Sequence, residues 1–512
     1  MKDCIMRLRG HPSLLVWCGS NEKFPQADIG QPLQNDLLPT LDGTRPWLPS
    51  SDENPPWRKE DILFWSGGPY QLVRLPEYFK LYAQDPKSIS KNEIGLSSPP
   101  PINSVVRAIP DYDQPDSLSF PLNRTFGYHD ATDNYYRNGD KIIRQDLGEP
   151  ATLTDYLWMG DLYNSASYRA IYEAANKVRP RNSGTHIWKI NAAWPSMMQQ
   201  VFDWYLRPNA GYYSMRSACQ PLHVQHSVDD QSVQVVSTLA EPSELRVSIT
   251  LTDITGRLEY SEEYPVVMPA DTTLKVCSLP DFVKDGHLHF LGLELVDSSG
   301  RSIDHVVTWV QGECQWQELL KVGLAEVEAK VISQRHEGNE TIYEVEVINH
   351  SPVPAVQVWV EVLCGPQGNE ILPSFWTDNA LTLLPGEKRN VTVRFRTDIL
   401  GQASAHLMVE GFNVHPREIK VANNEEVLLK LKVVNGNFNV VDNILKINVT
   451  SDGVDGQRYT TWPLEVRIDG QLIRTVRVAI TKEKQETAFI PIGTLPPGEH
   501  RIEVGKYWFG FL

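Results

Sequence analysis

The chain has 512 residues, of which 41% are hydrophobic and 22% charged, and its formal net charge is −16 at pH 7. That length exceeds what one hydrophobic core can serve and predicts about three to four domains of ordinary globular composition. The negative charge argues against a nucleic-acid partner, because binding nucleic acid needs a basic face on the protein. The sequence contains no run of about 18 apolar residues, so we expect no membrane partner.

The cysteines and the asparagine sequons bear on metal sites and on location. The six cysteines are scattered and have no histidine at ligand spacing, so we expect neither a metal nor a cofactor. Five N-x-S/T sequons are typical of a secreted, lysosomal or vacuolar protein; they begin at Asn123, Asn339, Asn349, Asn390 and Asn448. Residues 1–10 lack the apolar centre of a signal peptide and open within an expected helix. We therefore expect the chain to be a fragment, a processed chain or an incomplete sequence.

Residues 1–222 predict a parallel α/β region. Short apolar runs are followed by long connections, among them an expected helix over 151–178. This order is typical of parallel strands joined by helices. The candidate strands are residues 13–18, 46–49, 63–66, 88–93 and 185–191.

From residue 223 onward the pattern changes to strict alternation of apolar and polar residues. Runs such as Ser232–Val236 and Tyr343–Val347 alternate with turn signals about every ten residues, which is typical of antiparallel β-sandwiches. The turn Leu384–Glu387 recurs in similar form at Pro496–Glu499, which indicates sandwiches of related design. We expect three such domains, over 223–315, 316–415 and 416–512.

Two glutamates follow candidate strands of the α/β region. The apolar run Ser13–Cys18 follows His11-Pro12, is expected to be buried on both faces, and ends at Gly19, directly before Asn21 and Glu22. A second extended run ends at Glu93, beside Gly95 and a proline-rich turn. In a barrel of parallel strands the catalytic groups lie at the carboxyl ends of the strands, whereas either glutamate alone could be a solvated loop residue.

These segments resemble glycoside hydrolase family 2, in particular the branch of mannosylglycoprotein endo-β-mannosidases and exo-β-D-glucosaminidases. The resemblance rests on Arg9 with His11-Pro12-Ser13 and Asn21-Glu22, on Glu93-Ile94-Gly95, and on the stretches 184–195 and 203–225. It implies strands 4–8 of a (β/α)8 barrel followed by immunoglobulin-like sandwiches. It also implies a retaining hydrolase, with Glu22 as general acid/base and Glu93 as nucleophile. A retaining enzyme uses two carboxyl groups about 5–5.5 Å apart, one protonated and one ionised.

The resemblance also implies residues that contact the sugar. Trp188 would form the floor of the −1 subsite, bordered by Asn191 and Trp194, while Asn21 would bind the sugar 2-hydroxyl. Trp65 and Tyr70 belong to a loop like one beside the family's active site. His129, next to Tyr128, is either a substrate contact or a structural histidine.

The substrate and the completeness of the barrel stay open. Glu22 favours β-linked mannose, as in the N-glycan core Manβ1-4GlcNAc, because the exo-glucosaminidases tend to carry aspartate there; residues 223–236 look closer to the exo-glucosaminidases of chitosan oligosaccharides. A non-catalytic carbohydrate-binding scaffold and an unrelated α/β enzyme fused to immunoglobulin-like repeats are the alternatives. A five-strand remnant cannot close. An N-terminal segment or a companion polypeptide is therefore expected to complete the barrel.

Overall fold

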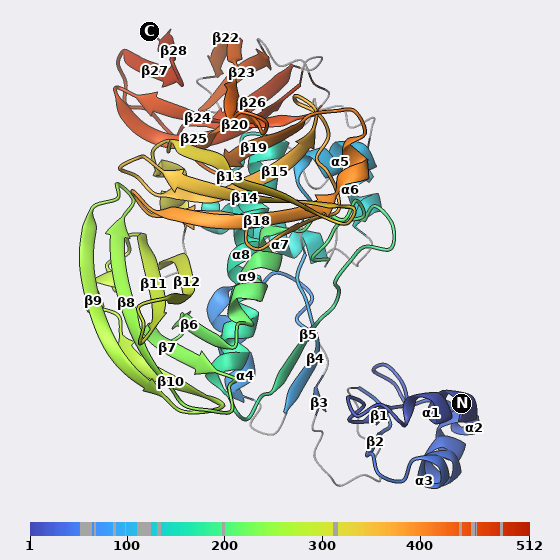
Figure 1. Cartoon of the computed structure of the whole chain (residues 1–512). Coiled ribbons are helices and arrows are strands. Elements are labelled where there is room, and N and C mark those ends of the chain that lie inside the picture. Colours follow the sequence, from blue (N-terminus) through green and yellow to red (C-terminus); the bar gives the residue numbers. More distant parts are fainter. Residues whose placement is uncertain are drawn as a thin grey trace.

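The computed structural model describes residues 1–51, 64–65, 68–84, 89–97, 99–109, 124–130, 135–196, 200–310, 316–439, 443–451, 456, 458–481 and 485–511. Helices and short parallel strands occupy the part before residue 219, and antiparallel sheets follow up to residue 511. Figure 1 shows the sheets stacked along one side of the long helix α8 (Leu153–Lys177).

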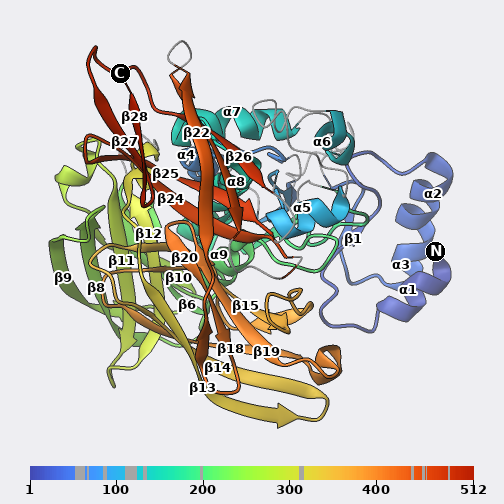
Figure 2. The same ribbon diagram turned by 90° about the horizontal axis from the view of Figure 1, so that it is seen from above.

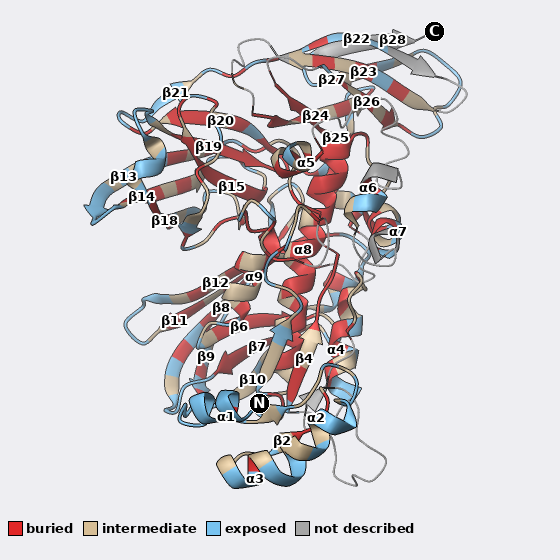
Figure 3. Cartoon of the chain, turned by 90° about the vertical axis from the view of Figure 1, so that its right-hand side faces the viewer, coloured by how far each residue is buried: buried red, intermediate tan, exposed pale blue. Residues whose placement is uncertain are grey.

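The first 51 residues form a small segment at the edge of the molecule (Figures 1 and 2). It contains α1 (Lys2–Leu8), β1 (Trp17–Cys18), α2 (Ala27–Pro32), a π-helical turn (Leu33–Leu37), α3 (Leu38–Leu41) and β2 (Trp47–Leu48). β1 and β2 pair in parallel, with Trp17 opposite Trp47. Figure 3 shows the helices of this segment as largely exposed.

The predicted strand over 13–18 was too long, and its burial on both faces was wrong. Only its last two residues pair with a neighbour, and the Leu15 side chain is 68% exposed. The cause lies in Arg45, whose guanidinium donates to the backbone carbonyls of His11 and Leu14. A side chain therefore takes the hydrogen bonds that a neighbouring strand would have made.

The second parallel sheet lies between helices. Its strands are β3 (Phe64–Trp65), β4 (Ser90–Ile94) and β5 (Gly184–Ile187), in that order. The helices of this part are α4 (Leu75–Gln84), α5 (Ile102–Ala108), α6 (Arg124–His129), α7 (Tyr135–Leu147), α8 and α9 (Ala210–Ala218). The expected partial barrel of five strands is not seen in the described residues: they form two separate parallel sheets, in which β1, β2 and β3 each contribute only two paired residues.

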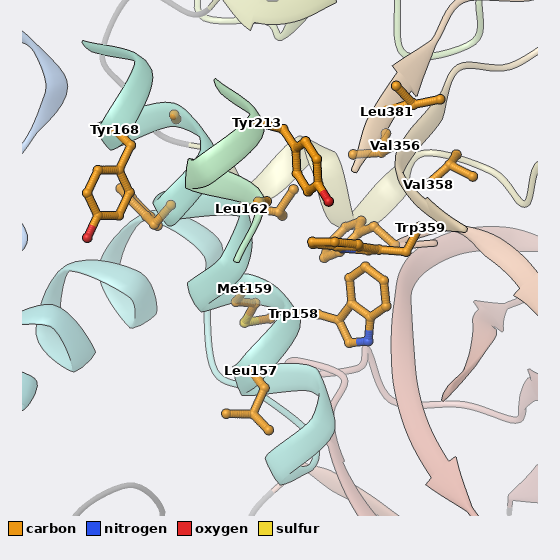
Figure 4. Close-up of a cluster of buried hydrophobic side chains, with 14 of the residues drawn as sticks. Leu157, Trp158, Met159, Leu162, Tyr168, Tyr213, Val356, Val358, Trp359 and Leu381 are labelled. Carbon is orange, nitrogen blue, oxygen red and sulfur yellow. The ribbon is translucent and has the colours of Figure 1, made fainter. Parts of the chain in front are cut away.

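α8 is the central support of the molecule. Thr152 caps its first turn by accepting a hydrogen bond from the Asp155 amide, and the helix runs for 25 residues. Most of its residues are buried because α4, α9, β6 and β25 all pack against it. Figure 4 shows a further contact of this helix, where Trp158 lies beside Trp359 of an antiparallel sheet.

The first antiparallel sandwich begins directly after α9. One sheet consists of β6 (Leu222–Ser227), β7 (Ser232–Ser237) and β10 (Thr272–Ser278), and the other of β8 (Ser243–Asp253), β9 (Leu258–Met268), β11 (His289–Asp297) and β12 (Ser302–Val310). Alternate residues of both sheets, such as Val224, Val235, Ile249 and Leu293, are buried in one shared core.

A second sandwich packs against the helices. One sheet contains β13 (Val327–Glu337), β14 (Glu340–Asn349), β16 (Ser374–Trp376) and β18 (Lys388–Arg396), and the other contains β15 (Ala355–Cys364), β17 (Leu381–Leu383), β19 (Ala405–Gly411), β20 (Val414–Lys420) and β21 (Glu425–Val427). Its buried side chains are continuous with those of α8, so the two parts share one core.

The last two sheets form the end of the molecule that carries the C-terminus. They contain β22 (Leu431–Asn439), β23 (Ile444–Ser451) and β26 (Glu486–Pro491), and then β24 (Thr460–Ile468), β25 (Gln471–Ile480), β27 (His500–Val504) and β28 (Tyr507–Phe511). Leu445, Ile447, Val466 and Val478 lie in a core common to both sheets. The alternating sequence pattern therefore predicted the antiparallel strands of this β-rich half correctly.

Within the described ranges, no helix combines the length and the apolar character that crossing a bilayer requires. Nor do three histidine, cysteine, aspartate or glutamate side chains come together there in a way that could hold a metal ion.

Candidate active site

Glu22 lies at the turn that follows β1. The Gly19 amide donates to the Leu48 carbonyl, and a Cβ on Gly19 would come within 2.3 Å of the Trp47 ring, so only glycine fits there. The chain then turns, and Glu22 itself has a φ of 55°. This left-handed conformation is uncommon for a residue with a side chain, although nine other non-glycine residues of the described chain also have a positive φ.

A charged cluster beneath β1 fixes this turn. The Trp17 indole N–H donates to Asp42 at 2.9 Å, and Arg45 forms an ion pair with the same carboxylate at 2.8 Å. Together with Thr44, these contacts lower the pKa of Asp42 to about 2, with the Trp17 hydrogen bond as the largest cause. Asp42 is therefore ionised at neutral pH and holds β1 to the loop before β2.

Ser51 connects the two glutamate-bearing segments. Its hydroxyl accepts a hydrogen bond from the Glu22 amide at 2.9 Å and donates to the side-chain oxygen of Asn21 at 3.4 Å. Its backbone carbonyl accepts a hydrogen bond at 3.0 Å from the side-chain amide of Asn92, the residue before Glu93 on β4. The backbone of Glu22 and the side chain of Asn92, the neighbour of Glu93, thus contact the same residue, although 70 residues lie between Glu22 and Glu93 in the sequence.

Two aromatic residues join the Glu22 turn to the parallel sheet. The Tyr70 hydroxyl donates to Glu22 Oε1 at 3.5 Å, and the Tyr70 ring meets Trp188 edge to face with centroids 5.8 Å apart. Trp188 follows β5, and its amide donates to the Ile94 carbonyl, one residue beyond Glu93. Its indole is 36% exposed, so part of its face is open to a ligand.

For two other predicted site residues, Asn191 and Trp65, no contact with the Glu22 turn is described. Asn191 is exposed, and its side chain donates a hydrogen bond to the carbonyl of the next residue, Ala192, at 3.3 Å. Trp65 lies on β3 opposite Lys91, but its side chain is outside the described residues.

His129 and Trp194 form a separate aromatic group. Their rings stack with centroids 5.4 Å apart, Tyr128 meets both rings edge to face, and His129 Nδ1 lies 2.6 Å from the Pro195 carbonyl. The His129 ring therefore supports Trp194, as a structural histidine would. Nothing in the described geometry places this pair against Glu22.

Sequence reasoning missed Ser51 and Asn92. A short polar side chain alone carries little signal, because serine and asparagine are common in turns. The only indication lay in position, since Ser51 is the second residue after the candidate strand 46–49 and Asn92 directly precedes Glu93.

Two families match the antiparallel part of the chain. Residues 229–312 match the family described as Mannosidase Ig/CBM-like domain, and residues 305–414 match the Exo-beta-D-glucosaminidase Ig-fold domain. These matches agree with the immunoglobulin-like sandwiches seen in the structure.

Longer similarities extend into the parallel region. An exo-β-D-glucosaminidase from Streptomyces avermitilis is 26% identical over 459 residues, which cover 81% of this chain and 49% of that protein. A mannosylglycoprotein endo-β-mannosidase from Lilium longiflorum is 28% identical over 313 residues, which cover 51% of this chain and 30% of that protein. The chain thus spans about half the length, or less, of these curated relatives.

The solved structure of the exo-chitosanase CsxA from Amycolatopsis orientalis has a similar fold. It superposes with a TM-score of 0.72 at 23% identity, and the match covers 82% of this chain and 53% of that one.

Proposed function

Because this chain is a homologue of the exo-β-D-glucosaminidases and endo-β-mannosidases of glycoside hydrolase family 2, we propose that it hydrolyses β-glycosidic bonds with retention of configuration. Glu22 is the general acid/base and Glu93 the nucleophile. The relatives are glycoside hydrolases, and the assignment of the two carboxylates to this chain is our own.

One observation carries the proposal, namely the attachment of both glutamate-bearing segments to Ser51. The Glu22 amide and the Asn92 side chain bind opposite parts of this residue, while Tyr70 and Trp188 connect the Glu22 carboxylate to the end of β4. A shared anchor of this kind keeps the two glutamate-bearing segments side by side, and the retaining mechanism requires two carboxylates that act on one glycosidic bond.

The mechanism follows from these positions. Glu93 attacks the anomeric carbon while protonated Glu22 delivers its proton to the leaving oxygen, and the glycosidic bond breaks as an ester forms on Glu93. Glu22, now ionised, removes a proton from water, which attacks the anomeric carbon and releases Glu93. Asn21 uses its side-chain oxygen to bind Ser51, which leaves its amide N–H groups to bind the sugar 2-hydroxyl.

The charges near Trp188 favour a neutral sugar. The Lys189 ammonium lies 5.1 Å from the centroid of the Trp188 ring, beside the surface that would hold the sugar. A protonated glucosamine would face this like charge, whereas mannose would not. We therefore propose β-linked mannose as the substrate; glucosamine is the second candidate, favoured by the names of the relatives with the longest matches.

A 2-deoxy-2-fluoro mannoside with a good leaving group tests the mechanism. It should form an ester on Glu93 that mass spectrometry of a protease digest can locate. Glu93→Gln should block labelling, and the matched 2-deoxy-2-fluoro glucoside should label more slowly. Labelling of another carboxylate, or turnover without any adduct, would contradict the assignment.

The first 51 residues also indicate a polypeptide partner. Several of their large apolar side chains are exposed, including Met6, Leu8, Leu15, Phe24 and Ile29. Exposed large apolar side chains are typical of an interface where they lie together. We propose that other strands and helices cover this surface and join the two short parallel sheets into one barrel.

A further inference from the structure

One cavity is lined by residues between Tyr213 and Arg389, far from Glu22 and Glu93 in the sequence. It occupies about 300 Å3 where α9, the edge strand β12 and the segment between β16 and β18 meet. A smaller recess beside α8 shares the side chains of Tyr213, His305, Asp378 and Arg389 with it. Figures 1 and 3 show α9 beside β12 next to α8. The volume is at the lower end of the range for small-ligand pockets, about 300–1,000 Å3.

Two arginines without a carboxylate partner lie here: Arg216 lines the cavity, and Arg169 lines the smaller recess beside it. Among the described residues, neither Arg169 nor Arg216 forms an ion pair. Arg216 donates from Nη1 to the carbonyls of Trp376 and Thr377. The hydrogen bond of Arg169 to the Ser214 hydroxyl is long, at 3.4 Å, and its buried Nη1 has no hydrogen-bond partner among the described residues.

Asp378 supplies the complementary acceptor. Its carboxylate makes no ion pair with a described residue and accepts a hydrogen bond from the amide of Asn379 at 2.9 Å. Burial raises the pKa of Asp378, and the nearby charges of Arg389, Arg169 and Arg216 oppose this rise. Donors and an acceptor thus surround the cavity without being joined to one another directly.

The other charged groups at the wall are already paired. Arg389 binds Glu387 at 2.7 Å, and His223 binds Asp304 at 2.7 Å. Burial, together with the charge of Arg389, lowers the pKa of His305 to about 3, so its ring is neutral. The groups without an ion-pair partner are therefore the guanidinium groups of Arg169 and Arg216 and the carboxylate of Asp378. This carboxylate would repel a strongly anionic ligand.

We propose that this cavity is a non-catalytic saccharide-binding site that holds one neutral sugar unit. A sugar hydroxyl both donates and accepts hydrogen bonds, so neighbouring hydroxyls can accept from Arg169 and Arg216 and donate to Asp378. The site shares its ligand class with the proposed hydrolase but does not depend on hydrolysis. It would anchor one part of a glycan while another part of the same glycan reacts at Glu22 and Glu93.

Binding of β-1,4-mannobiose to the whole chain tests this site, with Glu93→Gln present to prevent turnover. Titration calorimetry or saturation-transfer NMR should show binding that persists when Trp188→Ala is added. Asp378→Asn keeps the hydrogen bond to the Asn379 amide and should weaken this binding by about tenfold, as should Arg169→Gln. Arg257→Gln, on an exposed hairpin, is the matched control and should have no effect.

Three results would overturn the proposal: no mannobiose binding, binding that Trp188→Ala alone abolishes, or binding that neither pocket variant weakens. Preferential binding of inorganic phosphate would show an anion site instead. Circular dichroism must show that the variants are folded, and Asp378→Asn without Glu93→Gln should hydrolyse substrate at the wild-type rate. If the chain with its barrel completed by the proposed partner polypeptide hydrolyses no substrate while mannobiose still binds in this cavity, the hydrolase proposal fails and the binding site stands.

Discussion

At the scale of single residues, the Ser51 hydroxyl controls how Glu22 is presented. It accepts a hydrogen bond from the amide of Glu22, whose backbone is in the left-handed conformation. It also donates a hydrogen bond to the Asn21 side chain. Without it, the turn could relax to a backbone conformation of lower energy. The Glu22 carboxylate would then move relative to Glu93.

Removing this hydroxyl should lower the rate of hydrolysis more than the affinity for substrate. We expect Ser51→Ala to reduce kcat by about tenfold, the effect of losing a hydrogen bond worth about 1.4 kcal/mol. The measurement is steady-state hydrolysis of a 4-nitrophenyl β-mannoside. Ser299→Ala removes a hydroxyl from an exposed turn and serves as the control. Equal activity of both variants would show that Ser51 does not position Glu22.

The role of Glu22 can be separated from that of Glu93 by the choice of leaving group. A 2,4-dinitrophenolate departs without protonation, so Glu22→Gln should still form the glycosyl-enzyme from this substrate and show a burst of product. The same variant should lose about 100-fold or more in rate with a sugar leaving group, where proton donation is needed. Glu93→Gln should fail with both. An equal loss with both leaving groups in Glu22→Gln would argue against its acid role.

At the scale of elements, α8 is fastened to the last antiparallel sheets by one carboxylate. Asp155 forms ion pairs with Arg477 at 2.6 Å and Arg474 at 3.1 Å, and all three side chains are buried. It also accepts a hydrogen bond from the Ala151 amide at 3.0 Å. The contact joins the first turn of the helix to β25.

Neutralising this carboxylate would leave two buried guanidinium groups without a counter-ion. We expect Asp155→Asn to lower the free energy of unfolding by about 3–5 kcal/mol, the usual cost of breaking a buried ion pair from one side. Urea unfolding followed by tryptophan fluorescence measures this change. Asp297→Asn breaks an exposed pair with Arg301 and should cost less than about 1 kcal/mol. A similarly small loss in Asp155→Asn would contradict the assigned role.

The contact between α8 and the first sandwich should depend on pH. Burial lowers the pKa of His223, but Asp304 at 2.7 Å and Glu173 at 3.5 Å outweigh it and raise the pKa to about 9. A folded-state pKa above the unfolded value of 6.5 stabilises the protein most below pH 6.5. This stabilisation is lost as the pH rises through 9.

Unfolding measurements at several pH values check this dependence. The difference in unfolding free energy between wild type and His223→Gln should be on the order of 2 kcal/mol at pH 7 and should shrink toward pH 9. His336→Gln, on an exposed hairpin, should show no such trend. A difference that stays constant between pH 6 and pH 10 would mean that His223 is neutral in the folded protein.

Sequence patterns revealed the elements whose order depends on local periodicity. The helix expected over 151–178 is α8, and the alternating runs after residue 223 are strands of sandwiches. Strand lengths in the parallel region were not predictable in the same way, because Arg45 satisfies carbonyls before β1 from 31 or more positions away. The pairing of His129 with Trp194 likewise depends on a contact that no local pattern encodes.

At the scale of the whole molecule, the two halves differ in how well they are covered. The antiparallel sheets bury continuous cores, whereas residues 1–51 expose many large apolar side chains (Figure 3). β1 and β2 also have few hydrogen-bonded neighbours in their sheet. A two-stranded sheet of this size has little stability of its own. The segment that carries Glu22 is thus the part of the chain with the least support.

This difference predicts that residues 1–512 alone hydrolyse substrate slowly or not at all. Hydrogen exchange of the isolated chain should be rapid over residues 1–51 and slow in α8 and the sandwiches, because exchange follows local stability. Adding the polypeptide that completes the barrel should protect residues 1–51 and raise activity by at least about 100-fold, since both carboxylates would then be held rigidly. Leu15→Glu, a change on the exposed apolar surface, should prevent this rescue, whereas Val267→Glu, on the equally exposed β9, should not. Full turnover by the isolated chain, with residues 1–51 already protected, would show that no partner is needed.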